Sequence, residues 1–279
     1  MTTPLLETLA TLAAEAGRAT LAHYRTPVAH QEKADKSPVT AADLASEAVI
    51  LPGLAKHFPD IPVVSEEAAS RGESPDLAER FFLVDPLDGT KEFLKGRQEF
   101  TVNIGLIDGG EPIAGAVLAP ALGTLYLGER SVGAFKASYG EAMTGPRGAL
   151  TPIRCAQAPA GDPRIVASRS HLDPATQAFI ECTPHGGLVQ TGSSLKFCLV
   201  AEDQADLYPR FGRTMEWDTA AGQAVLESAG GAVLCLDGTP LRYGKEDRGL
   251  DNPYFLAGVG PLEDAVARCR SVLPDRPDE

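Results

Sequence analysis

The spacing of hydrophobic residues predicts two helices at the beginning of the chain. Hydrophobic positions recur every three or four residues over 4–24, which is typical of an amphipathic helix. A second helix is predicted to begin after Thr40 with a pattern like a capping box, in which Asp43 stands in the first turn. Pro52 inside this helix predicts a kink or a break. The polar stretch 28–39 between the two helices is expected to be a loop.

From about residue 60 the pattern changes to short apolar runs separated by turns, which predict strands. The sequence Asp108-Gly109-Gly110 between two such runs is typical of a hairpin turn. Strands are expected over residues 61–65, 81–84, 102–107, 113–118, 124–128, 132–136 and 151–155.

In the remainder of the chain, predicted strands alternate with predicted helices, which indicates a layered α/β region. We therefore expect an N-terminal α+β part over residues 1–158 and a C-terminal α/β part over residues 159–279. Strands are expected over residues 164–168, 187–191, 205–208, 233–236 and 254–259, and helices over 174–181, 194–200, 218–229 and 261–272.

The composition excludes some classes of function. The chain has 279 residues, of which 43% are hydrophobic, and a net charge of −13. This charge argues against a nucleic acid polymer or an anionic membrane as the main partner. It would also repel a phosphorylated small molecule, unless metal ions or local Arg and Lys side chains reversed the field.

The cysteines and the N-terminus indicate a cytoplasmic protein. The five cysteines are odd in number, widely spread and without a C-x-x-C pair, so free thiols are expected. The N-terminus does not resemble a signal peptide, and no apolar run has the length of a transmembrane segment. Peripheral association with the inner membrane and homodimer formation stay open at this point.

The stretch from Val84 to Phe93 is the strongest candidate for chemistry. It follows the apolar run 81–84 and carries two carboxylates, Asp85 and Asp88, three positions apart. Paired carboxylates at the end of a strand suit hard divalent cations, because two buried charges would be costly without them. Gly89 and the residue after it allow a tight turn into a short helix, whose first amides suit a phosphate.

Four acidic residues in all stand at the ends of predicted elements: Glu66, Asp85, Asp88 and Asp218. Each alone is also explained as a helix cap or a turn residue. An EF-hand is excluded because its ligand position five residues before Gly89 is Val84. An aspartyl-phosphate phosphatase is excluded because Pro86 occupies the nucleophile position. A metal-bound water is then the expected attacking group.

Three motifs together resemble the inositol monophosphatase superfamily of Mg²⁺-dependent, lithium-sensitive phosphatases. They are Val64–Glu67, Asp85–Thr90 and Glu216–Gly222, in the order and spacing of that family, and the resemblance spans almost the whole chain. The fold that it implies is a layered α/β/α/β/α sandwich of the inositol monophosphatase and fructose-1,6-bisphosphatase type.

Within the superfamily the match looks closest to the CysQ type, the 3′(2′),5′-bisphosphate nucleotidases. Four further segments point to this type: Lys91–Phe93, Ser168–His171, Gly192–Phe197 and Asp206–Gly212. The implied reaction is hydrolysis of the 3′-phosphate of adenosine 3′,5′-bisphosphate to AMP, a step that clears a by-product of sulfate assimilation.

The resemblance also implies which residues hold two or more Mg²⁺ ions. Glu66, Asp85 and the carbonyl of Leu87 would hold one ion, and Asp85, Asp88 and Asp218 would hold a second. Most of these ligands lie in the N-terminal part, whereas Asp218 lies in the C-terminal part.

The resemblance implies catalytic roles as well. Glu66 and the hydroxyl of Thr90 would help to activate the attacking water, and Asp43 would support Thr90. The substrate-binding residues would be Glu66, Leu87, Asp88, Gly89, Thr90, Ser193, Lys196, Arg210 and Asp218.

One departure from the inositol-specific members bears on the substrate. Those members carry an acidic residue where this chain has Arg210, and an Arg prefers a phosphate to a neutral hydroxyl. Lys196 adds a second cation, so a substrate with one phosphate cleaved and another gripped is expected. If both are only solvated surface charges, the alternative is an inositol-1-phosphate, histidinol-phosphate or sugar phosphatase. An alternative of another class is a non-catalytic, metal-binding regulatory protein.

Overall fold

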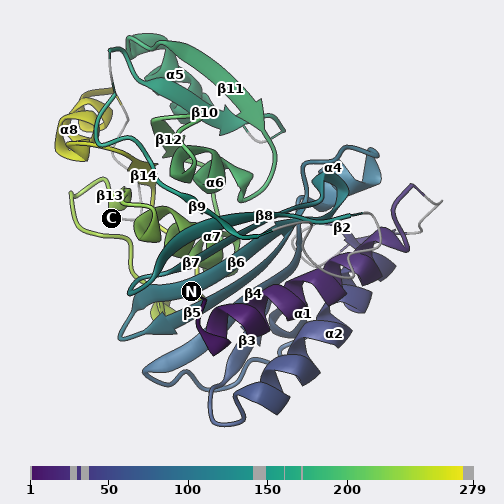
Figure 1. The fold of residues 1–279 in the computed structure, drawn as a ribbon. Coiled ribbons are helices and arrows are strands. Elements are labelled where there is room, and N and C mark those ends of the chain that lie inside the picture. The colour runs from purple at the N-terminus through teal and green to yellow at the C-terminus, as the bar shows by residue number, and fades with distance from the viewer. Residues whose placement is uncertain are drawn as a thin grey trace.

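The protein is built from alternating layers of helices and sheets (Figure 1). The computed structural model describes residues 2–25, 30–32, 38–140, 149–159, 161–170 and 172–272. Within these ranges the layers follow the order helix pair, seven-stranded sheet, helix pair, five-stranded sheet, helix pair. The predicted α/β/α/β/α sandwich is therefore confirmed.

The seven-stranded sheet follows the order of the sequence from β3 to β9. β3 and β4 are parallel, and every later pair of neighbours is antiparallel, including the predicted hairpin at Asp108–Gly110. The strands are β3 (Val63–Ser65), β4 (Arg80–Asp88), β5 (Thr101–Asp108), β6 (Glu111–Ala119), β7 (Thr124–Glu129), β8 (Gly133–Ser138) and β9 (Thr151–Ile153).

The five-stranded sheet has the order β11-β10-β12-β14-β13. β10 is parallel to β11 and β12, whereas β14 is antiparallel to β12 and β13. The strands are β10 (Arg164–Ser168), β11 (Gly187–Thr191), β12 (Leu207–Arg210), β13 (Ala232–Cys235) and β14 (Phe255–Gly258). The predicted division between residues 158 and 159 falls between the last strand of one sheet and the first strand of the other.

The helices form three of the layers. α1 and α2 cover one face of the large sheet, α6 and α7 lie between the sheets, and α5 and α8 cover the outer face of the small sheet (Figure 1). The helices are α1 (Pro4–Leu21), α2 (Ala41–His57), α3 (Glu66–Ser70), α4 (Thr90–Leu94), α5 (Pro174–Cys182), α6 (Leu195–Ala201), α7 (Glu216–Ser228) and α8 (Leu262–Val272), with 3₁₀ turns at Pro120–Leu122 and Glu246–Arg248.

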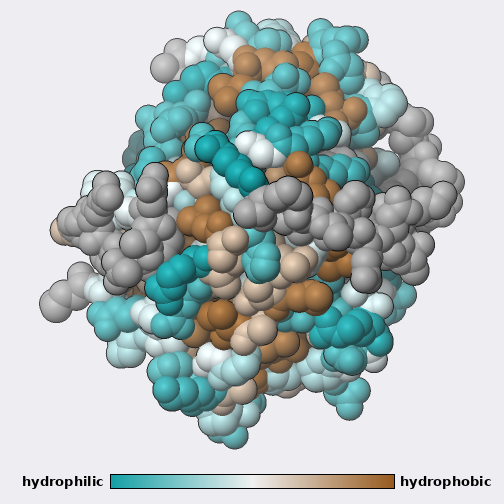
Figure 2. Space-filling model, turned by 90° about the vertical axis from the view of Figure 1, so that its right-hand side faces the viewer, coloured by the Kyte–Doolittle hydropathy of each residue, from teal (hydrophilic) through white to brown (hydrophobic). Residues whose placement is uncertain are grey.

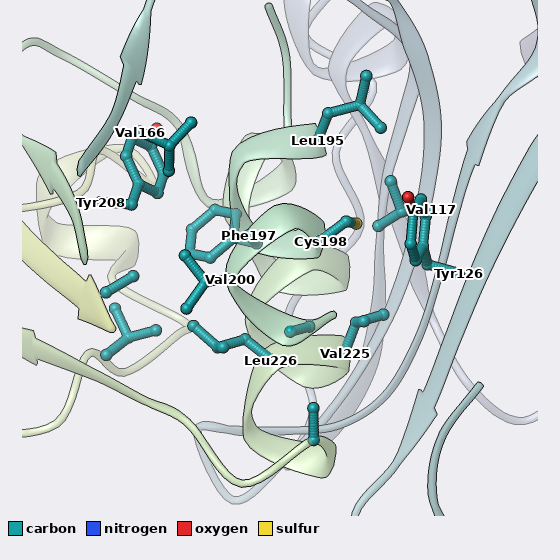
Figure 3. Packing of buried hydrophobic residues seen from close by; sticks show 14 of the residues in the cluster. Val117, Tyr126, Val166, Leu195, Phe197, Cys198, Val200, Tyr208, Val225 and Leu226 are labelled. Carbon is teal, nitrogen blue, oxygen red and sulfur yellow. The ribbon is translucent and has the colours of Figure 1, made fainter. Parts of the chain in front are cut away.

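The middle layer is buried on both sides. Phe197 and Val200 point towards the small sheet, whereas Cys198 and Val225 point towards Val117 of the large sheet (Figure 3). All five side chains are at most 1% exposed. Burying apolar surface at about 25 cal/mol per Å² is the main favourable term in folding, so this layer stabilises the association of the two sheets.

A row of glycines lets α7 approach the large sheet closely. Gly105, Gly115 and Gly128 are register partners on β5, β6 and β7. A Cβ at Gly115 would lie 2.5 Å from the carbonyl oxygen of Ala221, and at Gly128 it would lie 2.6 Å from Cα of Val225. The backbone of α7 therefore rests directly on the sheet, which fixes where the first turn of this helix lies.

Some of the predictions about local structure were wrong. Of the kink or break expected at Pro52, the break is not found: α2 continues through Pro52 to His57, and Ile50 and Leu54 on either side of the proline are fully buried against the core. The stretch 28–39 contains strand residues that form a two-stranded sheet, β1 (His30–Glu32) with β2 (Pro38–Thr40), while residues 26–29 and 33–37 lie outside the described ranges.

Neither the helices nor the visible surface of the described residues has the character of a membrane span. None of the helices in the described ranges is both long and apolar enough to cross a bilayer. Figure 2 shows hydrophobic and hydrophilic residues interspersed over the face that is at the right of Figure 1, with a band of brown and tan surface through its centre. Scattered apolar residues of this kind are normal on a globular protein.

Candidate active site

The acidic segment 85–88 is part of β4, not a turn that follows it. The strand was predicted to end at Val84, but its pairing with β5 resumes at Asp88 opposite Thr101 after an irregularity between Asp85 and Asp88. Asp85 is 1% exposed, and its Oδ1 accepts a hydrogen bond of 3.0 Å from the N–H of Leu87. Between Asp85 and Asp88, β4 departs from regular pairing with β5, as at a β-bulge, and the strand bends locally. The predicted turn therefore corresponds to an irregular part of the strand.

The predicted turn into a short helix is confirmed at Gly89. This residue has φ +91° and immediately precedes α4, and a Cβ there would lie 3.2 Å from the carbonyl oxygen of Glu99. The left-handed conformation and the close backbone both require glycine. The hydroxyl of Thr90, the first residue of α4, lies 3.2 Å from the carbonyl oxygen of Leu87 and 3.4 Å from Oδ1 of Asp43.

Asp43 connects the start of α2 to this turn. Its Oδ2 accepts hydrogen bonds from the N–H of Thr40 at 2.8 Å and from the hydroxyl of Thr40 at 2.6 Å, which completes the predicted capping box. Its other oxygen faces Thr90. Because Asp43 is 1% exposed and held by the cap, it orients the Thr90 hydroxyl towards the acidic segment.

Asp218 comes from the opposite direction, at the first turn of α7. Its Oδ2 accepts a hydrogen bond of 2.9 Å from the N–H of Met215. The next residue back, Trp217, packs into a buried cluster with Val64 and Phe81. The close seating of α7 on the glycine row therefore decides how near Asp218 lies to β4.

The carboxylates raise the pKa values of one another. Burial raises the pKa of Asp85 well above its usual range, and the charges of Glu66, Asp88 and Asp218 add to that effect. Burial raises the pKa of Asp218 to about 8, with Asp88 and Glu66 as the next causes. Burial raises the pKa of Asp88 to about 6, although the charge of Lys196 and the N–H of Ser194 lower it. Cations near these groups would relieve the repulsion.

Two cations face the acidic groups from the C-terminal part of the chain. Lys196, on α6, is 4% exposed, donates a hydrogen bond to the carbonyl oxygen of Ser193 and lies over the ring of Tyr208 at 5.3 Å. Burial lowers the pKa of Lys196 to about 8. Arg210, at the end of β12, is half-buried and donates to the carbonyl oxygen of Arg213 at 2.9 Å. Lys196 is thus not a solvated surface charge.

The turn before α6 carries further polar groups of the site. Ser193 has φ +50°, and its hydroxyl is buried without a hydrogen-bond partner in the described part of the chain. The same holds for Nε of Arg210. Ser194 precedes α6, but its side chain does not cap the helix. Its hydroxyl instead donates a hydrogen bond of 2.7 Å to Oδ1 of Asn103 on β5.

These groups line one cavity of about 190 Å³. It brings together most of the predicted substrate-binding residues, from both parts of the chain. Its lining includes Asp88, Gly89, Thr90, Ser193, Lys196, Arg210 and Asp218. A second cavity, of about 460 Å³, has Glu66 in its lining, which is otherwise formed mainly by apolar residues such as Met215 and Trp217. The smaller cavity holds the opposed charges, so it is the candidate active site.

The acidic groups fit Mg²⁺ in their chemistry, because all their donors are oxygen atoms. Within the described ranges, no group of three or more Asp, Glu, His or Cys side chains is close enough together to hold a metal ion. The ion predicted at Glu66, Asp85 and the Leu87 carbonyl needs only two such side chains. The ion predicted at Asp85, Asp88 and Asp218 needs three, so these would have to draw together.

Sequence reasoning missed several residues that support the site. Ser46 donates a buried hydrogen bond of 2.7 Å to the carbonyl oxygen of Pro86. Glu47 accepts hydrogen bonds from the residues on either side of Glu66. The available signal was the three polar residues Asp43, Ser46 and Glu47 at helical spacing within an otherwise apolar region of α2.

The fold and the site define a family. The model of the inositol monophosphatase family matches residues 1–259, and the chain belongs to this family. The chain is 44% identical over 257 residues to the 3′(2′),5′-bisphosphate nucleotidase CysQ of Escherichia coli (strain K12), which covers 91% of this chain and 100% of that protein. It is 30% identical to the CysQ of Haemophilus influenzae over 90% of this chain and 91% of that protein.

Solved structures agree with this assignment. The crystal structure of CysQ from Bacteroides thetaiotaomicron is similar with a TM-score of 0.75 and 38% identity, over 92% of this chain and 97% of that chain. The inositol monophosphatase from Anabaena (Nostoc) has a TM-score of 0.74 and 27% identity, over 97% of this chain and 96% of that chain. The predicted family resemblance is therefore confirmed.

Proposed function

We propose that this protein is a Mg²⁺-dependent phosphatase that hydrolyses the 3′-phosphate of adenosine 3′,5′-bisphosphate to give AMP and phosphate. The observation that carries the proposal is the cavity in which Asp88 and Asp218 face Lys196 and Arg210. Acidic groups on one side suit metal ions, and cations on the other suit a second phosphate of the same substrate. The 44% identity to the CysQ of Escherichia coli supports the same substrate.

Glu66, Asp85 and the carbonyl of Leu87 would hold one Mg²⁺, and Asp85, Asp88 and Asp218 a second. When bound, the ions would polarise the phosphoryl oxygens, neutralise charge that develops in the transition state and make water a better nucleophile. The raised pKa values of Asp85, Asp88 and Asp218 support this assignment, because bound cations would offset the burial and the mutual repulsion that raise them.

The chain itself orients the water and the phosphate. The single proton of the Thr90 hydroxyl points towards its two neighbouring acceptors, Oδ1 of Asp43 and the carbonyl oxygen of Leu87. The lone pairs of the hydroxyl oxygen are then directed away from these groups and would accept a hydrogen bond from the attacking water. Glu66 would accept the proton as the water oxygen bonds to phosphorus. As the bond from phosphorus to the ribose 3′-oxygen breaks, a proton from solvent would pass to that oxygen, which leaves as the 3′-hydroxyl of AMP. The backbone of Gly89 and Thr90 would hold the phosphoryl oxygens.

Lys196 and Arg210 would hold the phosphate that is not cleaved. Lys196 is fixed by the carbonyl of Ser193 and by the ring of Tyr208, so little side-chain entropy is lost when a phosphate arrives. Position 210 is an Arg and not the acidic residue that would bind a sugar hydroxyl, which argues for a phosphate as its partner. Ser193, in the same turn, would add a hydroxyl donor.

A phosphate-release panel tests the proposal. With Mg²⁺ present, we expect adenosine 3′,5′-bisphosphate to be hydrolysed with a higher kcat/KM than inositol 1-phosphate, histidinol phosphate or sugar phosphates. Chelation with EDTA should abolish release, and Li⁺ at fixed Mg²⁺ should inhibit it. Faster hydrolysis of inositol 1-phosphate would contradict the substrate, and release that persists in EDTA would contradict the metal.

The proposal implies a physiological role. An enzyme with this activity would act in the cytoplasm and would remove the bisphosphate by-product of sulfate assimilation. Homodimer formation and association with the inner membrane stay predictions, each of which needs its own measurement.

A further inference from the structure

A buried carboxylate on α2 is bonded to both sides of Glu66. Glu47 is 5% exposed, and its Oε1 accepts a hydrogen bond of 2.5 Å from the hydroxyl of Ser65 and one of 3.0 Å from the N–H of Ala68. Its other oxygen, Oε2, accepts a hydrogen bond of 3.1 Å from Nη2 of Arg71. Every oxygen of this side chain is therefore directed at the segment around Glu66.

The hydrogen bonds of Glu47 take the place of an ordinary N-cap at the start of α3. Glu66 is the first residue of α3, and Ser65 before it makes no cap hydrogen bond with its own side chain. The hydroxyl of Ser65 instead donates to Glu47, and Glu47 accepts from Ala68, whose N–H the cap would otherwise satisfy. The backbone of Glu66 is thus fixed from the residue before it and from the second residue after it.

The same helix holds the other acidic segment. Ser46 and Glu47 lie three and four positions after Asp43, so all three residues lie on one face of α2. Asp43 faces the hydroxyl of Thr90, and Ser46 donates to the carbonyl oxygen of Pro86, between Asp85 and Leu87. One helix face therefore bonds to the segment that carries Glu66 and to the segment that carries Asp85.

We propose that Glu47 is a positioning residue, which sets the place of Glu66 relative to Asp85. The inference rests on the proposed function, in which these two carboxylates share a Mg²⁺ ion. Without the acceptor at position 47, the N-terminus of α3 would lose its cap and its hydrogen bonds to α2. Glu66 would then be ordered by the metal alone, and the cost of ordering it would appear as weaker binding of Mg²⁺.

The test uses three variants of the full chain. Glu47→Met keeps the length of the side chain and removes both acceptors, whereas Glu47→Gln keeps Oε1. Glu73→Met is the matched control, because the Glu73 side chain also accepts from Arg71, at 2.9 Å, but is 60% exposed. The hydrogen bond of 2.9 Å from Glu73 to the carbonyl oxygen of Ala68 is made by the backbone N–H, which the substitution keeps. Mg²⁺ affinity is measured from the rise of the unfolding temperature with MgCl₂ concentration, without substrate.

We expect Glu47→Met to weaken Mg²⁺ binding by about 10–100-fold, the usual effect of removing a group that orients a metal ligand. Glu47→Gln should restore most of the affinity, and Glu73→Met should match the wild type. A Glu47→Met protein that unfolds at lower temperature but binds Mg²⁺ as tightly as the wild type would overturn the inference.

The variants also distinguish a failure of the Glu47 inference from a failure of the proposed metal site. If Glu47→Met does not fold, Ser65→Ala removes one of the two hydrogen bonds at Oε1, and unchanged Mg²⁺ affinity in that variant would overturn the inference. If Mg²⁺ does not stabilise the wild type at all, the proposed metal site fails, and with it the inference. A wild type that responds to Mg²⁺ while Glu47→Met responds equally leaves the proposed function intact and refutes only the role of Glu47.

Discussion

The backbone N–H of Ser194 donates a hydrogen bond of 2.6 Å to Oδ2 of Asp88, across 106 positions of the sequence. Asp88 is the last residue of β4 in the large sheet, and Ser194 precedes α6 in the layer between the sheets. Lys196, two residues later, adds its charge to the same carboxylate. The acidic segment and the cationic segment are thus directly bonded, so neither part of the chain holds a complete site.

The first prediction concerns Asp88. Asp88→Asn keeps an oxygen that accepts from Ser194 but removes the charge that a cation needs. We expect Mg²⁺-dependent phosphate release to fall by more than about 100-fold. Loss of a residue that only orients a metal ligand typically costs about 10–100-fold, and loss of the ligand itself should cost at least as much. The circular dichroism spectrum should stay that of the wild type. Asp76→Asn, at an exposed position, is the control, and an Asp88→Asn enzyme as active as this control would refute the two-metal assignment.

The second prediction concerns the glycine row under α7. In Gly115→Ala the new Cβ would lie 2.5 Å from the carbonyl oxygen of Ala221, so the helix must move off the sheet. We expect a loss of about 1–3 kcal/mol in the free energy of unfolding, as is usual for overpacking, measured by urea denaturation. Activity should fall as well, because Asp218 moves with the helix. Gly161→Ala, where a Cβ meets nothing within 4 Å, should leave both quantities unchanged.

The third prediction concerns the buried end of the small sheet. Asp206 accepts from the N–H, Nε and Nη2 of Arg164 at 2.7–2.8 Å, and its side chain is 5% exposed. Asp206→Asn should lower the free energy of unfolding by about 2 kcal/mol at pH 7, since hydrogen bonds to charged groups are the strong ones. Asp203→Asn removes a 53% exposed partner of the same arginine and should cost much less.

The same pair predicts a dependence on pH. The hydrogen bonds from Arg164 lower the pKa of Asp206 in the folded protein below its ordinary value of 3.8. A lowered pKa contributes stability that is fully present above the ordinary value and is lost as the pH falls through the folded value. The difference in unfolding free energy between the wild type and Asp206→Asn should therefore be constant from pH 7 to about 5 and shrink below pH 4. A difference that grows at low pH would contradict this assignment.

The individual strands and helices and the turn at Gly89 could be predicted from the sequence, because they depend on local signals. The order of the five layers and the grouping of Glu66 and Asp218 with Asp85 and Asp88 were instead what the family resemblance implied. The apolar run before Asp85, the turn at Gly89 and the capping box from Thr40 to Asp43 each lie within a few residues, and all are found in the structure. Whether the resulting carboxylates hold two ions stays a prediction.

The supporting contacts were not predictable because they join distant segments. Ser46 and Glu47 read as ordinary helix residues until α2 is placed beside Pro86 and Ser65. Pro52 was expected to kink or break this helix, but the helix continues through it, because burial of the neighbouring residues outweighs the lost hydrogen bond. The extension of β4 to Asp88 depends in the same way on pairing with β5, which the sequence of β4 alone does not contain.

The most direct test of the substrate compares two nucleotides that differ only in the second phosphate. The kcat/KM for adenosine 3′,5′-bisphosphate is measured against that for adenosine 3′-monophosphate, in the wild type, in Arg210→Met and in the exposed control Arg248→Met. We expect the wild type and the control to prefer the bisphosphate by at least about tenfold, and Arg210→Met to lose most of that preference. Equal rates on both nucleotides in the wild type would contradict the proposal that Lys196 and Arg210 grip a second phosphate.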